Sequence, residues 1–136
     1  MLPAGFDALC AAANAEGFTF LDRLAQRWRA GGYDGDGAAS LRCAYADGQL
    51  AGVGAQTFDE YDPGPDRRRI RHFYILPQLR RRGAGRTLAG ELIADAFALA
   101  PRLHLRATHA LSTAFWDAMG FARVDHPSRS HELVRP

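Results

Sequence analysis

The sequence contains no lysine, only two cysteines, and no apolar run long enough to cross a membrane. A membrane-spanning helix needs about 20 mainly apolar residues, and charged residues interrupt the apolar stretches here well before that length. Cys10 and Cys43 lack C-x-x-C or Cys/His ligand spacing, so we expect structural thiols and no metal site. The start of the chain lacks a basic cluster followed by an apolar segment, which argues against a cleaved signal and predicts a cytoplasmic protein.

The charge of the chain is almost balanced. All 17 basic residues are arginine, and 15 acidic residues leave a formal net charge of +2. A protein that follows many phosphates of a nucleic acid usually has a broad basic face. The arginines do gather locally, at 67–69 with Arg71 and at 80–82 with Arg86, which raises the positive potential there. The composition therefore favours a local anion site over binding of nucleic acid.

The length of 136 residues and the 47% apolar content predict one domain, residues 1–136, with a single core. Apolar residues at three- and four-residue spacing between Phe6 and Ala30 predict two helices. The dipeptide Asp47-Gly48 is typical of a type I′ hairpin turn. The expected strands are 40–46, 49–58, 70–76, one starting at Pro101, 121–124 and 129–134, with further helices after Gly85 and over 110–119. This pattern predicts an α/β (α+β) fold in which helices flank a mixed sheet.

Residues 80–86, Arg-Arg-Arg-Gly-Ala-Gly-Arg, connect an expected strand to an expected helix. Small residues let backbone N–H groups approach a ligand closely, and a helix start adds the positive end of its dipole. Arginine side chains add charge-assisted hydrogen bonds to phosphate. The missing lysine of a phosphate loop argues against a nucleotide hydrolase. The segment predicts an oxyanion site, and a solvated run of arginines is the alternative.

The segment from Phe73 to Gly85, Phe-Tyr-Ile-Leu-Pro-Gln-Leu-Arg-Arg-Arg-Gly-Ala-Gly, resembles the signature of the GNAT acetyltransferase superfamily. That signature is a strand ending in proline, followed by Q/R-x-x-G-x-G/A at the start of a helix. Phe115-Trp116-x-x-x-Gly120-Phe121 is similar to the later family motif F-Y-x-x-x-G-F. The resemblance implies a mixed, mostly antiparallel twisted sheet with about four helices. Members commonly begin with a strand, and residues 1–5 are too short for one, so the sheet could lack it.

The resemblance implies acetyl-CoA as the acyl donor. The segment 80–86 would bind the pyrophosphate, and the main chain of 73–75 would pair with the pantetheine amides like an added strand. Trp116 would pack along pantetheine or belong to the core. The implied cofactor contacts are Phe73, Tyr74, Ile75, Arg80, Arg81, Arg82, Gly83, Ala84, Gly85, Arg86, His109, Ser112, Phe115 and Trp116.

Acyl transfer from a thioester to an amine needs a held nucleophile and a donor for the developing oxyanion. The resemblance implies that a main-chain N–H, best placed at Ile75, polarises the carbonyl. Family members commonly use the motif tyrosine to protonate the leaving thiolate, but an indole at Trp116 cannot do so. A water or the Ser112 hydroxyl could serve instead. His109 stands where members often carry asparagine, and it could contact the cofactor, act as an acid, or be a surface histidine.

The acceptor pocket is harder to identify from the residues. Glu60 or Asp59 could act as a base through water, or both could be solvated loop carboxylates. Glu16 could select a cationic amine or simply end a helix. Two histidines, His126 and His131, could line the same pocket. His72 is expected to pack in the interior or to lie at the surface.

The expected function is transfer of an acetyl group from acetyl-CoA to a primary amine of a small molecule or peptide, by direct attack in a ternary complex. The alternative is a catalytically weak module that binds acetyl-CoA without turnover. Edge strands near the C-terminus make a homodimer a reasonable expectation.

Overall fold

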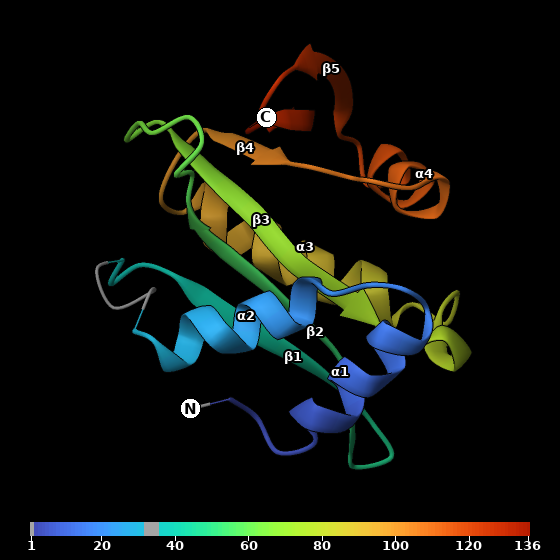
Figure 1. Ribbon diagram of the computed structural model, residues 1–136. Coiled ribbons are helices and arrows are strands. Elements are labelled where there is room, and N and C mark those ends of the chain that lie inside the picture. The colour runs from blue at the N-terminus through green and yellow to red at the C-terminus, as the bar shows by residue number, and fades with distance from the viewer. Residues whose placement is uncertain (1, 32–35) are drawn as a thin grey trace.

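A six-stranded sheet with helices on both faces forms the centre of the protein (Figure 1). The computed structural model describes residues 2–31 and 36–136. Its helices and strands are, in chain order, α1 (Phe6–Ala15), α2 (Phe20–Arg29), β1 (Ser40–Ala46), β2 (Gln49–Phe58), β3 (Arg67–Ile75), the 3₁₀ helix η1 (Pro77–Leu79), α3 (Ala84–Phe97), β4 (Arg102–Leu105), α4 (Ala110–Ala118), β5 (Ala122–His126) and β6 (Arg129–Val134).

The strands lie in the order β1-β2-β3-β4-β6-β5. Neighbours are antiparallel except β3 and β4, which are parallel. This arrangement confirms the predicted mixed, mostly antiparallel sheet. Residues 2–5 form no strand, so the chain enters α1 directly. None of the described helices has the length and hydropathy that crossing a membrane requires.

Two apolar clusters hold the layers together. On one face of the sheet, α3 packs through Leu88 and Leu92 against residues such as Ile75 and Leu103. On the other face, α1 and α2 cover β2 and β3, with Leu9, Leu21 and Leu24 at the centre of that cluster. Figure 1 shows α3 behind the sheet and α1 and α2 in front of it. Each helix buries the stripe of residues that its three- and four-residue spacing predicts.

The β1–β2 hairpin confirms its predicted turn. Asp47 and Gly48 have φ angles of 51° and 78°, and a type I′ turn requires positive φ at both central positions. The third strand differs from its prediction, because β3 begins at Arg67 and not at residue 70. The three added arginines all form ion pairs in the structure, so their charges do not prevent them from entering the sheet.

β3 and β4 are paired only near their starts. The pairs are Arg67 with Arg102, Arg68 with Leu103 and Arg69 with His104. Beyond them β3 bulges, since its register against β2 shifts and His72 has a φ of 54°. Figure 1 shows the two strands side by side at one end and diverging toward α4 and η1. The C-terminal half of β3 therefore has an unpaired edge on its β4 side.

Candidate functional site

The loop before α3 presents free backbone N–H groups. Gly83 is the N-cap residue, with φ 86° and ψ −12°, and no side chain caps this helix end. The first bond of the helix runs from Thr87 N–H to the Gly83 carbonyl, 3.0 Å. The amides of residues 84–86 consequently have no acceptor within the helix. A Cβ atom on Gly83 would meet nothing within 4 Å, so glycine is favoured there by the left-handed backbone and not by crowding.

The four arginines of this loop divide into two groups. Arg81, Arg82 and Arg86 are exposed, and none of them forms an ion pair with a carboxylate of the described residues. Arg80, by contrast, is fully engaged within the protein. Its Nε donates to the Ile75 carbonyl at 3.0 Å, and its two terminal nitrogens donate to Glu16 at 2.7 and 2.9 Å.

Glu16 connects the loop to the first helix and to β3. Besides Arg80, it accepts a hydrogen bond from the Tyr74 hydroxyl at 2.6 Å. The hydrogen bonds from Arg80 lower the pKa of the Glu16 carboxyl, and although partial burial opposes them, the bond from Tyr74 adds to the effect. Glu16 is thus an anion held by internal partners, and it fixes the position of the loop relative to the strand.

The free edge of β3 points toward the divergence from β4. Leu76 N–H donates to the Ala51 carbonyl on β2, 2.9 Å. Successive residues of a strand direct their amides to opposite edges, so the Ile75 amide faces away from β2. The Ile75 side chain is buried, 6% exposed, against α3. Main-chain groups of β3 and the start of α3 therefore lie on one continuous path, from an unpaired strand edge to a group of free amides.

Comparison with known proteins agrees with this geometry. The model of the acetyltransferase (GNAT) family matches residues 7–121 of the chain. The chain belongs to the GNAT family. No curated protein sequence matches it.

Solved structures of GNAT proteins share the fold. A protein assigned as an acetyltransferase from Exiguobacterium sp. 255-15 is 26% identical, with a TM-score of 0.83 over 93% of this chain and 82% of that one. The ribosomal-protein-alanine N-acetyltransferase of Brucella melitensis is 22% identical, with a TM-score of 0.65 over 98% and 93%. The PaiA N-acetyltransferase of Thermoplasma acidophilum, solved in complex with coenzyme A, is 17% identical, with a TM-score of 0.56 over 85% and 70%.

His109 and Ser112 form the start of α4 in this GNAT domain. His109 is the N-cap residue, and its Nδ1 accepts from Ser112 N–H at 3.3 Å while the Ser112 hydroxyl donates to the His109 carbonyl at 3.0 Å. The imidazole stacks on Phe18 with ring centroids 4.9 Å apart. His109 therefore lies where α4 meets the connection between α1 and α2, and it is exposed.

Trp116 belongs to the aromatic part of the core. It is 4% exposed, and its ring centroid lies 5.0 Å from Phe73, 4.9 Å from Phe115 and 5.3 Å from Phe121. Phe73 and Phe115 also stack on each other at 5.3 Å. A Cβ on Gly85 would lie 3.4 Å from Phe115, so this ring group also packs beneath the start of α3.

The two carboxylates that the sequence suggested as bases are both held by internal partners. The Asp59 side chain is buried and lies 2.8 Å from Nδ1 of His104 and 3.6 Å from Nη1 of Arg69. Glu60 pairs through Oε1 with Arg27 at 3.0 Å and Arg71 at 2.5 Å. Burial would raise the pKa of Glu60, but the hydrogen bonds and charges of the two arginines outweigh it and lower that pKa. A carboxylate with a lowered pKa is a weak base.

The remaining histidines have structural environments. His131 is 1% exposed and lies 3.0 Å from Asp117 and 2.7 Å from the Ser130 hydroxyl. His126 accepts from Ser128 N–H at 3.1 Å in the β5–β6 turn. Burial, and then the charge of Arg71, lower the pKa of His72 to about 3. The structure therefore places His126 in the β5–β6 turn and gives His131 a buried, structural environment.

The structure distinguishes Arg69 and Arg71 from the general basic cluster in which the sequence placed them. Alternation along β3 places both on the face that α2 covers, and Arg69 reaches the Ser128 carbonyl at 3.0 Å. The signal in the sequence was their spacing of two residues, which places two side chains on the same face of a strand. Their burial, however, depends on the loop after β2 and on the β5–β6 turn, which are far away in sequence.

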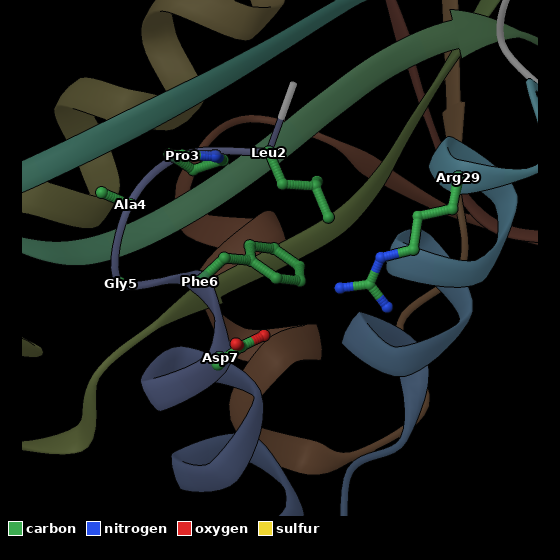
Figure 2. A pocket seen from close by; sticks show the side chains of 7 residues that line it. All are labelled: Leu2, Pro3, Ala4, Gly5, Phe6, Asp7 and Arg29. Carbon is green, nitrogen blue, oxygen red and sulfur yellow. The ribbon is translucent and has the colours of Figure 1, made fainter.

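A separate hollow of about 260 Å³ lies at the start of α1. Figure 2 shows Phe6 and Asp7 on one side of it and the Arg29 guanidinium on the other. α1 has ten residues, so its start is about 15 Å from the Glu16 end that touches the loop. The hollow shares no residue with the loop or with β3. Within the described chain, no group of three or more His, Cys, Asp or Glu residues is placed to hold a metal ion.

Proposed function

We propose that this GNAT protein transfers the acetyl group of acetyl-CoA to a primary amine of a small molecule or peptide, by direct attack in a ternary complex. The observation that carries the proposal is the continuity between the unpaired β3 edge and the free amides at the start of α3. Acetyl-CoA supplies a thioester whose acetyl group passes to the amine nitrogen, while CoA leaves as a thiol.

The residues present fit this donor. The free amides of residues 84–86 and the unpaired side chains of Arg81, Arg82 and Arg86 match a diphosphate. The edge at 73–75 offers main-chain groups to an extended chain that contains amides, which resembles the addition of a strand. The Thermoplasma relative was solved in complex with coenzyme A, which supports the same donor for this chain. Arg80 contributes by bracing the loop through Glu16 and not through a free guanidinium.

The reaction is assisted in two ways, by polarisation of the thioester carbonyl and by protonation of the leaving group. We propose that the Ile75 N–H polarises the thioester carbonyl, since it faces the open edge of β3 and a preformed donor costs no reorganisation. His109 and Ser112 lie at the start of α4, beside the α1–α2 connection, and one of them or a water would protonate the leaving thiolate. Trp116 is buried, and its indole N–H is not acidic enough to protonate a thiolate, so turnover would depend little on a side-chain acid.

The paired state of Glu60 argues against it as the base. Its anion is shared by Arg27 and Arg71, so the incoming ammonium would lose its proton to water. The alternative function is a protein that binds acetyl-CoA without turnover, and the missing motif tyrosine at Trp116 is the observation in its favour.

The test combines binding and turnover. Calorimetry measures acetyl-CoA binding to the wild type and to a variant with Arg81, Arg82 and Arg86 changed to glutamine. Arg23→Gln is the control, because Arg23 is also exposed and forms no ion pair among the described residues. We expect the triple change to weaken binding at least about tenfold and the control to have no effect. A thiol-release assay over an amine panel separates the two functions, because binding without release on any amine favours the second.

His109 is tested by a pair of substitutions. His109→Asn retains an N-cap side chain, while His109→Ala removes it. If His109 protonates the leaving group, both variants lose about 10²-fold or more in kcat. If it only caps and stacks, His109→Asn keeps wild-type turnover.

A further inference from the structure

Arg71 is a buried arginine with an unused hydrogen-bonding edge. It lies on β3, two residues beyond the last pair with β4, at the mouth of the divergence. Its side chain is 9% exposed, and Nη1 donates to Glu60 at 2.5 Å. The other two nitrogens, Nε and Nη2, are buried and have no hydrogen-bond partner. Because buried donors of a charged group are almost always satisfied in proteins, this edge points to a group that is absent from the protein itself.

The geometry of the free edge indicates what that group is. Nε and Nη2 lie along one edge of the planar guanidinium, and their parallel N–H bonds match the two oxygens of one carboxylate. The same chain contains a filled example of this pairing. Arg42 donates from Nε to Asp95 Oδ2 at 2.6 Å and from Nη2 to Oδ1 at 2.8 Å. A carboxylate on Arg71 would reproduce that arrangement.

The cover over Arg71 is an exposed side chain of a loop. The ring of Tyr61 lies over two guanidinium groups, with its centroid 4.6 Å from Cζ of Arg69 and 5.7 Å from Cζ of Arg71. Tyr61 is 60% exposed and belongs to the segment between β2 and β3. A ligand could displace this ring without opening the core. It would then meet two positive charges on the face of the sheet opposite α3.

We infer that Arg71 binds the carboxylate of the acceptor, so that the acceptor is a small amine that also bears a carboxylate, such as an amino acid. The reaction itself rests on the proposed function; the carboxylate site does not need turnover. Glu60 is a positioning residue in this scheme, because it holds Nη1 and thereby orients the free edge.

The experiment uses leucine, phenylalanine, glutamine and lysine, each as the free acid and as the amide. Thiol release from acetyl-CoA gives kcat/KM for the wild type, Arg71→Lys and Arg67→Lys. Lysine keeps the positive charge but lacks the pair of parallel N–H donors that binds a carboxylate in a bidentate way. Arg67 lies on the same strand and pairs with Asp62 and Asp66, so it is a matched control for the substitution itself.

We expect the wild type to prefer free acids over the matching amides by at least about tenfold. Arg71→Lys should lower kcat/KM for the free acids about ten- to a hundredfold, mainly through KM, and leave the amides unchanged. Arg67→Lys should preserve the preference. Equal use of acids and amides by the wild type, or an equal loss for both in Arg71→Lys, would overturn the inference while leaving the proposed function intact.

A binding measurement keeps the inference testable without turnover. Calorimetric titration of each free acid into the wild type in the presence of CoA should show binding that the amides and Arg71→Lys lack. If thiol release fails for every amine but this binding is seen, the proposed function fails and the carboxylate site stands. If the titrations show no difference between acid and amide, the carboxylate site is wrong.

Discussion

Replacement of Gly83 by alanine tests the backbone conformation on which the loop before α3 depends. Gly83 has a φ of 86°, and a left-handed conformation costs an L-residue roughly 1–2 kcal/mol. No clash adds to this cost, because a Cβ there would meet nothing within 4 Å. The smaller entropy of an unfolded chain with alanine returns about 0.4–1 kcal/mol. The difference between the two ranges is about 0–1.6 kcal/mol, and we expect a net loss of folding free energy near its middle, about 0.8 kcal/mol.

Gly85→Ala is the matched control, two residues further along. Gly85 lies inside the first turn of α3 without a positive φ, and its Cβ would contact Ile75 and Phe115 at 3.4 Å. Alanine at this position also lowers the conformational entropy of the unfolded chain, but without a strained backbone in the folded state. The stability of this variant should therefore be unchanged or slightly higher. Thermal unfolding measures both. For a chain of 136 residues we expect Gly83→Ala to lower Tm by roughly 2–6 °C and Gly85→Ala not to lower it.

Acetyl-CoA binding to the same variants tests the function of the loop. The strained alanine at 83 should relax the turn and misdirect the amides of residues 84–86, so its affinity should fall more than that of Gly85→Ala. Asn at 83 should restore both properties, since asparagine tolerates the left-handed region. Equal Tm values for the two alanine variants would refute the conformational argument. A lower Tm with unchanged affinity would refute the role of these amides.

Three further predictions concern packing, charge and the motif tryptophan. Gly54→Ala should lower the free energy of unfolding by about 1–3 kcal/mol, because its Cβ would lie 2.6 Å from Leu92 Cδ1. Urea unfolding would show this as a lower midpoint, and an unchanged midpoint would show that α3 can move away. The hydrogen bond from Arg42 lowers the pKa of Asp95, so the unfolded carboxyl takes up protons at a higher pH than the folded one. Asp95→Asn should therefore lower the free energy of unfolding by about 1 kcal/mol near neutral pH. Urea titrations should show that this difference between variant and wild type disappears as the pH falls through the lowered pKa of Asp95. A difference that is independent of pH would contradict the prediction. Trp116→Phe should lower Tm but leave kcat within about threefold, and a loss near 10²-fold would show that the indole takes part in the reaction.

The order of elements and the location of the loop followed from the sequence alone. Asp47-Gly48 determines the first hairpin, because both residues tolerate positive φ. The apolar spacing of α1, α2 and α3 determines which face each helix buries. The run from Phe73 to Gly85 was enough to identify the family, since strand, turn and helix start are consecutive in the chain. All of these are local properties that neighbouring residues decide.

The tertiary structure alone decided which charged side chains are free. The sequence presents Arg71 and Arg80 as members of two similar clusters, yet Arg80 is tied to Glu16 and Arg71 is buried with one edge unused. It offers Glu60 as a base, but Arg27 and Arg71 converge on that carboxylate from elements far apart in the chain. The energy of a charge depends on its partners and its burial, and only the folded chain brings together residues that are distant in sequence.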